Sequence, residues 1–241
     1  MSGWHKGRSI RTTSLGVALA VAVPLSLAGP LGLTGPAGAA AAPETTITSG
    51  PPDGVVLRGR AVVYGLESSA TPPSFTCSLN DRPITCTTSG ADLSNLEGGT
   101  YTLRAAATDA TGLADPTPAE RTFTVPFDDD VLTQKGEWSD HKKPAAFDGD
   151  YVRSTDKGAK LVYRVSDVVG IRLAVSTGPE FGRVQVRLGS KVLKTVNTRG
   201  GVRSLRLKPV ATFDTPRAGK LRIVVAGHRE VRIEGLAVIT G

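Results

Sequence analysis

The sequence predicts an all-β protein built as two sandwiches. Short runs between residues 43 and 241 alternate apolar and polar side chains, and no stretch sustains the period of a helix. Turn residues such as Gly98-Gly99 and the Asp109-Ala110-Thr111-Gly112 segment separate these runs. Charge divides the chain: residues 43–126 hold five Lys/Arg and nine Asp/Glu (net −4), whereas residues 127–241 hold twenty-one and thirteen (net +8). We therefore expect two units, 43–126 and 127–241, joined near Pro126.

The first 42 residues are predicted to be a cleaved signal peptide. His5, Lys6, Arg8 and Arg11 form a basic start, the apolar run SLGVALAVAVPLSLAGPLGL follows, and small residues in GPAGAAAAPE suit signal peptidase between Ala39 and Ala42. Paired arginines of a Tat signal, a lipoprotein cysteine and a C-terminal apolar span are all missing from the sequence. We expect a secreted or envelope-associated protein of net charge +4 without a transmembrane anchor.

The two cysteines lie in FTCSLNDRPITC and are predicted to form a disulfide. If the hairpin turns between Asp81 and Arg82, Leu79 faces Ile84 and Cys77 faces Cys86. Facing residues of an antiparallel pair are close enough for a disulfide. A metal site lacks further ligands nearby, whereas two reduced structural thiols remain the alternative.

Residues 43–126 resemble the bacterial Ig-like modules of secreted actinobacterial proteins. The resemblance rests on PETTITSGP, the cysteine hairpin and LEGGTYTLRAAATDATGLADPTPAERTFTV, and it departs at YGLESSATPPSF. It implies an Ig-like β-sandwich that serves as a spacer or scaffold. We therefore assign no functional site to this unit.

Residues 127–241 show longer alternating strands. Val184, Val186 and Leu188 alternate with arginine or glutamine, and Val231 and Ile233 alternate with Arg232 and Glu234. One wet and one dry face per strand is typical of an antiparallel sandwich. We therefore expect Glu234 to point outward.

The order of segments in this unit resembles secreted jelly-roll modules of the galactose-binding, carbohydrate-binding-module-like kind. The matching segments are Trp138-Ser139, RSTDKGAKLVYRV, TGPEFGRVQVRLGSK, GKLRIVV and VRIEGLAV. Gly189-Ser190 replaces the usual D-G turn, and Glu234 stands where Asp is common. The resemblance implies a β-jelly-roll that binds cell-envelope or extracellular polysaccharide.

The sequence contains few residues and no recognised motif for catalysis. After cleavage only His141 and His228 remain, and no G-x-S-x-G, H-E-x-x-H or Walker-type motif is present. A catalytic triad is recognised by geometry and stays open on sequence alone. We expect no enzyme activity, no catalytic residue and no specific nucleic-acid binding.

Aromatic and basic residues supply the candidate ligand-binding positions. A sugar ring stacks on an exposed aromatic, for which Trp138, Tyr151 and Phe181 are candidates, although core packing is the more ordinary role of Trp138 and Tyr151. Arginines and a lysine at outward strand positions suggest a positive face for anionic polymers, and of these Arg183 and Arg187 are predicted to contact ligand. A solvated arginine-rich surface is the plainer interpretation. The whole set is Arg183, Arg187, Arg206, Lys208, Arg222 and Arg232.

The jelly-roll resemblance also implies a structural calcium ion, the one cofactor considered. Oxygens are available from FDDD and FDGD, and the predicted metal residues are Asp128, Asp130, Asp148 and Asp150, with Asp129 beside them. A polar linker and a solvated turn explain the same residues. In the leading interpretation the protein is a non-catalytic polysaccharide binder, and in the alternative it is a structural or adhesive stalk that contacts surface proteins or anionic polymers.

Overall fold

The computed structural model describes residues 41–241, which consist almost entirely of strands. The all-β prediction is confirmed. The predicted signal peptide lies, apart from its last two residues, outside the described residues and stays a prediction. Between residues 41 and 241 no helix is long and apolar enough to cross a membrane.

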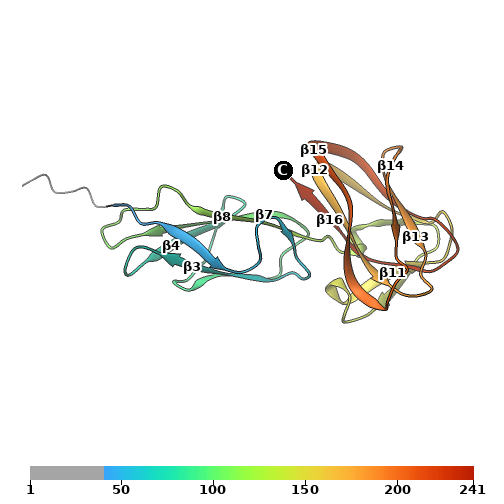
Figure 1. Ribbon diagram of the computed structural model, residues 1–241, viewed down its shortest axis with the longest axis horizontal. Helices are drawn as coiled ribbons and strands as arrows, with labels where there is room; N and C mark the ends of the chain where they lie inside the picture. Colours follow the sequence, from blue (N-terminus) through green and yellow to red (C-terminus); the bar gives the residue numbers. More distant parts are fainter. Residues whose placement is uncertain (1–40) are drawn as a thin grey trace, which may run out of the picture. The chain divides into compact units, whose positions relative to one another are not determined.

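Residues 45–125 form two sheets that share one apolar core (Figure 1). Every pairing is antiparallel except the parallel pair of β2 and β8. One sheet has the order β1 (Thr45–Ser49), β3 (Val62–Ser68), β6 (Gly90–Leu93); the other has the order β2 (Val55–Val56), β8 (Ala119–Val125), β7 (Gly99–Thr108), β4 (Ser74–Leu79), β5 (Arg82–Ile84).

Large side chains from both sheets meet between them. Tyr64 of β3, Leu103 of β7 and Phe123 of β8 are fully buried. The Phe123 ring lies 5.8 Å from that of Tyr64 and 5.4 Å from that of Tyr101. Because residues of the two sheets pack face to face, this part of the chain is a β-sandwich.

The cysteine hairpin turns one residue earlier than predicted. Leu79 pairs with Arg82, so that Asn80 and Asp81 are the two turn residues, with φ of 50° and 62°. Two-residue hairpin turns of type I′ need positive φ at both central positions, and Asn and Asp tolerate it. Cys77 therefore faces Ile84 instead of Cys86, and the predicted register is wrong.

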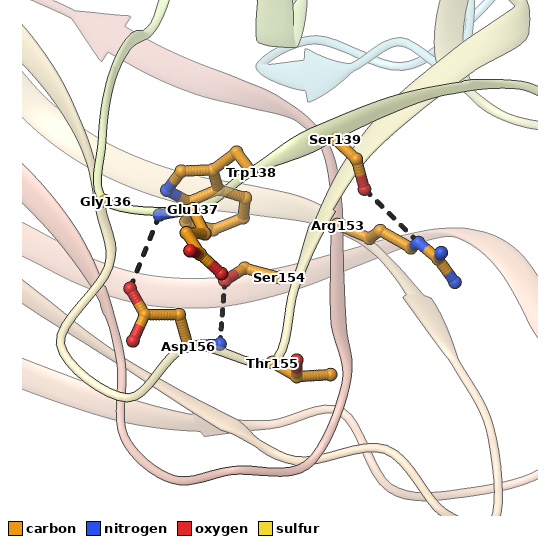
Figure 2. A pocket seen from close by; sticks show the side chains of 8 residues that line it. All are labelled: Gly136, Glu137, Trp138, Ser139, Arg153, Ser154, Thr155 and Asp156. Carbon is orange, nitrogen blue, oxygen red and sulfur yellow. Dashed lines mark hydrogen bonds between the residues drawn. The ribbon is translucent and has the colours of Figure 1, made fainter.

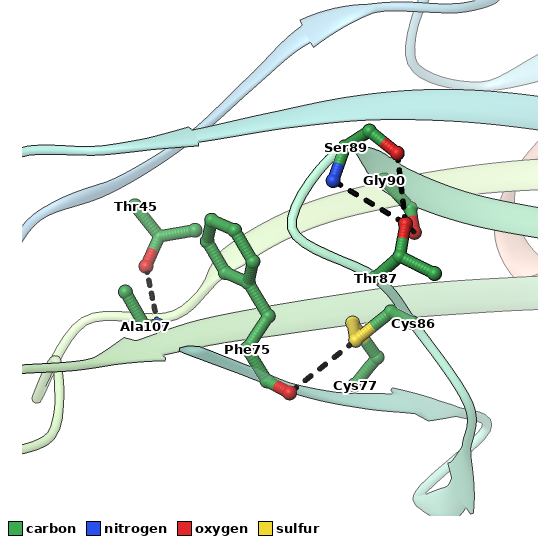
Figure 3. The surroundings of a disulfide bond; sticks show 8 residues. All are labelled: Thr45, Phe75, Cys77, Cys86, Thr87, Ser89, Gly90 and Ala107. Atoms are coloured by element: carbon green, nitrogen blue, oxygen red, sulfur yellow. Dashed lines mark hydrogen bonds between the residues drawn. A yellow bond between two sulfur atoms is a disulfide. The ribbon is translucent and has the colours of Figure 1, made fainter. Parts of the chain in front are cut away.

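The disulfide itself is confirmed (Figure 3). Cys77 and Cys86 are bonded, with their Cα atoms 6.0 Å apart. Cys77 is buried in the core on β4, while Cys86 lies beyond the end of β5. The bond therefore fixes the chain that leaves the hairpin against the sandwich core.

Reducing the disulfide is expected to lower the free energy of unfolding by about 2–3 kcal/mol, because a loop of roughly ten residues is then free in the unfolded chain. Urea unfolding with and without reductant measures the change. A Cys77→Ala/Cys86→Ala variant is the control and should not respond to reductant. Equal stability of the oxidised and reduced protein would show that the bond adds nothing.

Residues 133–240 form one hydrogen-bonded network of eight strands. Its main path runs through seven of them, and β9 pairs with β12 beside that path. Two short 3₁₀ turns, η1 (Asp129–Val131) and η2 (Phe147–Gly149), precede β9 and β11. The strands in the order of the path are β10 (Ser139–Lys142), β11 (Asp150–Ser154), β16 (Val231–Thr240), β12 (Lys160–Thr177), β15 (Arg203–Val225), β13 (Arg183–Leu188) and β14 (Lys191–Asn197), with β9 (Thr133–Lys135) against β12.

The two longest strands, β12 and β15, belong to both layers of a second sandwich (Figure 1). The first part of β12 lies between β9 and β15, and there β15 continues to β13 and β14. The second part of β12 lies between β15 and β16, which continues to β11 and β10. Register shifts around Val165 and Val168, with Asp167 at φ 53°, mark the bend where both strands change layer.

The predicted alternation in this part is largely confirmed. Val184 and Val186 of β13, and Val231 and Ile233 of β16, are buried in one core, as are Leu221, Ile223 and Val225 of β15. Residues 41–241 form one compact unit with these two cores. Phe127, just after Pro126, exchanges two backbone hydrogen bonds of 2.8 Å with Leu236 of β16.

Glu234 does not point outward, and that prediction is wrong. Its side chain is 0% exposed. Ala174 pairs with Gly235 and Val175 pairs with Ile233, so Glu234 is the extra residue of a β-bulge. A bulge changes the side of the sheet to which a residue points, and this one turns the carboxylate inward.

Three donors surround the Glu234 carboxylate. The Ser176 hydroxyl donates to Oε1 at 2.6 Å, and the backbone N–H groups of Phe147 and Leu205 donate to Oε2 at 3.2 and 2.8 Å. Leu205 has φ of 50°, a conformation that is uncommon for a bulky residue. The carboxylate thus joins β16 to the end of β12, the start of β15 and η2.

Replacing Glu234 with leucine is expected to cost about 3–5 kcal/mol of unfolding free energy, because three buried donors lose their acceptor. Glu234→Gln keeps one oxygen and should cost less. Chemical denaturation measures both variants, with Glu180→Gln as control because the Glu180 side chain is 81% exposed. A Glu234→Leu loss as small as that of the control would contradict the role of the carboxylate.

Candidate functional site

Two open hollows lie where loops connect the strands of the second sandwich. The first, which we call the tryptophan hollow, has a volume of about 510 Å³ (Figure 2). Glu137 N–H donates to Asp156 across it at 3.3 Å, and Arg153 donates to the Ser139 hydroxyl at 3.3 Å. The lining residues come from the β9–β10 and β11–β12 connections and the strand ends beside them: Gly136, Glu137, Trp138, Ser139, Arg153, Ser154, Thr155 and Asp156.

Trp138 lines this hollow but also packs against the core. The indole is half-buried and its Nε1 is buried without a hydrogen-bond partner in the described structure. A buried indole N–H usually finds an acceptor. Trp138 therefore combines the two roles that the sequence analysis considered: it packs against the core and it lines an open surface.

The second hollow, which we call the arginine hollow, has a volume of about 550 Å³. Three loops meet there, between β12 and β13, after β14, and between β15 and β16. Of the sequence candidates it contains Phe181 and Arg183. The full lining is Phe181, Gly182, Arg183, Thr195, Asn197, Arg199, Ala226, Gly227, His228 and Arg229.

Gly182 joins the three loops of the arginine hollow. Its N–H donates to the backbone carbonyl of Glu230 at 2.8 Å, and its own carbonyl accepts from both the N–H and the hydroxyl of Thr198 at 3.0 and 2.9 Å. A Cβ on residue 182 would lie 2.8 Å from the Arg229 carbonyl oxygen, so only glycine fits. The backbone of the hollow is therefore fixed by the fold.

Arg232 occupies the aromatic faces that the sequence suggested for stacking. Its guanidinium lies 4.9 Å from the Tyr151 ring centre and 4.7 Å from that of Phe181. Tyr151 is only 7% exposed, and His141 stacks on it at 5.5 Å. Tyr151 is therefore a packing residue, and Phe181 is held at the edge of the hollow with a cation against its ring.

The predicted basic face is divided. Arg187 and Arg222 are opposite each other on β13 and β15, within one layer, and both are half-buried. Arg187 donates to Gln185 at 2.7 Å and lines neither hollow. Arg206 and Lys208 lie on the part of β15 that belongs to the other layer, so the six basic residues do not form one continuous face.

Four carboxylates of the sequence prediction separate into two groups. Oxygens of Asp128 and Asp150 come together with Asp129, all within 4.8 Å of one another. Asp130 is exposed outside this cluster, and Asp148 pairs with Arg60 at 3.0 Å. Asp129 takes the place predicted for Asp130 because the η1 turn buries Asp129 and leaves Asp130 in solvent.

We call the cluster of Asp128, Asp129 and Asp150 the acidic cluster. Its carboxylates have too few hydrogen-bond donors and cations around them. Asp129 is 5% exposed and its Oδ1 has no hydrogen-bond partner in the described structure. Burial raises the pKa of Asp129 to about 8, and the charges of Asp128 and Asp150 add to the rise. Burial likewise raises the pKa of Asp128 to about 6.

Neighbouring cations satisfy only part of the acidic cluster. Arg60 lies 3.6 Å from Asp128, and Lys142 pairs with Asp150. No ion pair to Asp129 is found in the described residues. An orphaned, buried carboxylate oxygen beside two others is a donor set that suits a hard cation such as calcium.

A catalytic arrangement is not assembled around either histidine in the described structure. His141 lies 3.2 Å from the Ser139 hydroxyl, but no carboxylate hydrogen-bonds to its ring. His228 lines the arginine hollow beside arginines, with no serine or carboxylate among the lining residues. Neither histidine has both partners that acid–base activation of a serine needs.

Asn197, Arg199 and Arg229 were not among the sequence candidates, whereas His228 was considered only as a catalytic residue and Asp129 only beside the predicted metal residues. Asn197, Arg199, His228 and Arg229 lie in the basic turns NTRGG and AGHRE, which end and begin 25 residues apart. Both turns place glycine next to basic residues, a pattern that could indicate a binding loop. The pattern points to one site only when the two turns are known to lie together.

No protein-family model matches the chain, and no curated protein matches it. Among solved structures, CsCBM6-3 from Clostridium stercorarium in complex with cellobiose is similar at 19% identity and TM-score 0.37, covering 48% of this chain and 92% of that chain. The CBM36-1 domain of a multidomain xylanase from the hindgut metagenome of Trinervitermes trinervoides is similar at 19% identity and TM-score 0.35, covering 45% and 90%. SGBP-B of the Bacteroides ovatus mixed-linkage glucan utilization locus, in complex with a mixed-linkage heptasaccharide, is similar at 13% identity and TM-score 0.31, covering 83% and 48%. At these TM-scores the likeness assigns neither a family nor a ligand to this chain.

Proposed function

We propose that this chain is an exported, non-catalytic protein that binds polysaccharide of the cell envelope or the extracellular space. Residues 127–241 act as the binding unit with a jelly-roll fold, and residues 43–126 act as an Ig-like spacer. Export is supported by the signal peptide that the sequence predicts for residues 1–42 and by the disulfide, since disulfides form in oxidising compartments.

The arginine hollow is the observation that carries this proposal. It is an open hollow of about 550 Å³, and its backbone is fixed at Gly182. Its lining combines one aromatic ring with amide, hydroxyl, imidazole and guanidinium groups, which hydrogen-bond to hydroxyls and ring oxygens. Asn197 is fixed within it, because its Oδ1 accepts from the Arg199 N–H at 3.1 Å.

A structural or adhesive role is the second candidate. The net charge of +8 on residues 127–241 favours anionic partners in general. The division of the basic strand residues between two layers argues against one broad electrostatic face. Polysaccharide binding is therefore the function that the geometry supports best.

The full exported chain is expected to bind at least one polysaccharide in affinity electrophoresis with peptidoglycan, teichoic acid and plant polysaccharides in the gel. Asn197→Ala should weaken the interaction by about two- to tenfold, the equivalent of one hydrogen bond. Thr155→Ala in the tryptophan hollow is the matched control and should have no effect. Unchanged migration in every gel would refute polysaccharide binding, and loss only with Thr155→Ala would move the site to the tryptophan hollow.

The acidic cluster is proposed to hold a structural calcium ion. Asp128, Asp129 and Asp150 would supply carboxylate oxygens, and the ion would neutralise charges that are otherwise buried together. Its contribution would be stability, because the cluster lies outside both hollows.

Calcium is expected to raise the melting temperature more at pH 8 than at pH 5. Without the ion, the raised pKa of Asp129 means that the folded state binds more protons than the unfolded state, so stability falls as pH rises toward about 8. Saturating calcium at roughly a hundred times its Kd would add about 2.7 kcal/mol. Thermal melts with calcium or chelator at both pH values measure the difference.

Asp129→Asn should remove both the calcium response and the fall of stability between about pH 6 and 8, whereas the raised pKa of Asp128, about 6, leaves a fall at lower pH. Asp130→Asn is the control, since Asp130 is adjacent but exposed, and it should keep both. A wild-type melting temperature that is insensitive to calcium at pH 8 would exclude the ion.

A further inference from the structure

The arginine hollow is lined by cations without matching anions. Arg183, Arg199, Arg229 and His228 face it from three loops, and no carboxylate is among the lining residues. In the described structure no carboxylate lies within 4.0 Å of Arg183 or Arg199, and both are exposed. Arg229 approaches Glu180 only at 3.9 Å, between two exposed side chains.

Arginines just outside the hollow, in contrast, form ion pairs with a carboxylate. Arg153 lies 3.3 Å from Glu230, and Arg232 pairs with the same residue. Glu230 thus neutralises Arg153 and Arg232, the second of which lies against the rings of Tyr151 and Phe181. The arginines inside the hollow have no such partner, although like charges held together repel one another.

Stacking on Phe181 cannot be the main source of affinity. The Arg232 guanidinium covers its ring at 4.7 Å, and a Cβ on Gly178 would lie 3.1 Å from the same ring. The lining also carries guanidinium, imidazole, amide and hydroxyl groups, of which the guanidinium groups of Arg183, Arg199 and Arg229 bear a positive charge. Planar guanidinium groups bind carboxylate and phosphate oxygens through paired, charge-assisted hydrogen bonds.

We propose that the arginine hollow binds the oxyanion of an acidic polysaccharide, with Arg183 and Arg199 as its principal contacts. This deepens the proposed function and rests on it. The shared chemistry is a carboxylate or phosphodiester on a sugar chain, supplied either by a polyuronate or by a poly(polyol phosphate). Asn197, Thr195 and His228 then hydrogen-bond to the sugar next to the anion. These hydrogen bonds let the hollow distinguish an acidic polysaccharide from a polyanion that contains no sugar.

The test is affinity electrophoresis of the full chain with four polymers: polygalacturonate, poly(glycerol phosphate), neutral xylan and polyaspartate. One or both acidic glycopolymers should bind, xylan and polyaspartate should bind at least about tenfold more weakly, and raised salt should weaken the binding. The two acidic arms tell the uronate from the phosphodiester.

Arg183→Gln/Arg199→Gln is expected to weaken acidic-polymer binding by about tenfold or more, because charge-assisted hydrogen bonds are lost. Arg164→Gln/Arg206→Gln is the matched control: it removes the same charge from exposed strand positions outside the arginine hollow. Thermal melts verify that both variants fold.

The other outcomes distinguish binding of an acidic polysaccharide in the arginine hollow from polysaccharide binding in general. Equal weakening by both double variants, or equal binding of polyaspartate, would reduce the effect to net charge and overturn the proposal. Xylan bound as tightly as the acidic polymers, with no effect of the Arg183/Arg199 variant, would overturn it while polysaccharide binding stands. No binding to any polysaccharide would overturn both.

Discussion

The buried carboxylate of Glu234 is the interaction on which the second sandwich depends. It has three donors from β12, η2 and the start of β15, and it exists only because a bulge turns the residue inward. Two of these donors belong to Phe147 and Leu205, whose side chains contact the core of residues 45–125. Asp150 of the acidic cluster follows directly after η2. One buried charge therefore organises the path of three segments at once.

Charge has two different uses in this molecule. Where it is buried, it is structural: Glu234 has its donors, Asp128 contacts Arg60, and Asp129 keeps an unpaired oxygen that a calcium ion would satisfy. Where it is exposed in the arginine hollow, it is left without partners on a backbone that Gly182 fixes. The fold neutralises Arg232 with Glu230 but leaves Arg183 and Arg199, which line the hollow, without an ion pair, so these two are available for the proposed ligand.

The sequence predicted the sheets better than the site. Alternation found the buried positions of β13, β15 and β16, because period two is a local property of an extended strand. Glu234 and the hairpin register were predicted wrongly because a bulge and a two-residue turn each shift the count by one residue. Tyr151 was a reasonable stacking candidate until Arg232 and His141 were seen to cover it. The arginine hollow joins three loops distant in sequence, and the 3₁₀ turn η1 decides that Asp129 rather than Asp130 joins the acidic cluster, so neither arrangement could be predicted without the fold.

The most direct test of the account is a crystal structure of the full exported chain with an oligomer of galacturonic acid or glycerol phosphate. The account predicts that a carboxylate or phosphate of the oligomer lies within hydrogen-bond distance of the Arg183 and Arg199 guanidinium groups, with the sugar next to Asn197. An oligomer seated in the tryptophan hollow or along the strands, with the arginine hollow vacant, would contradict it.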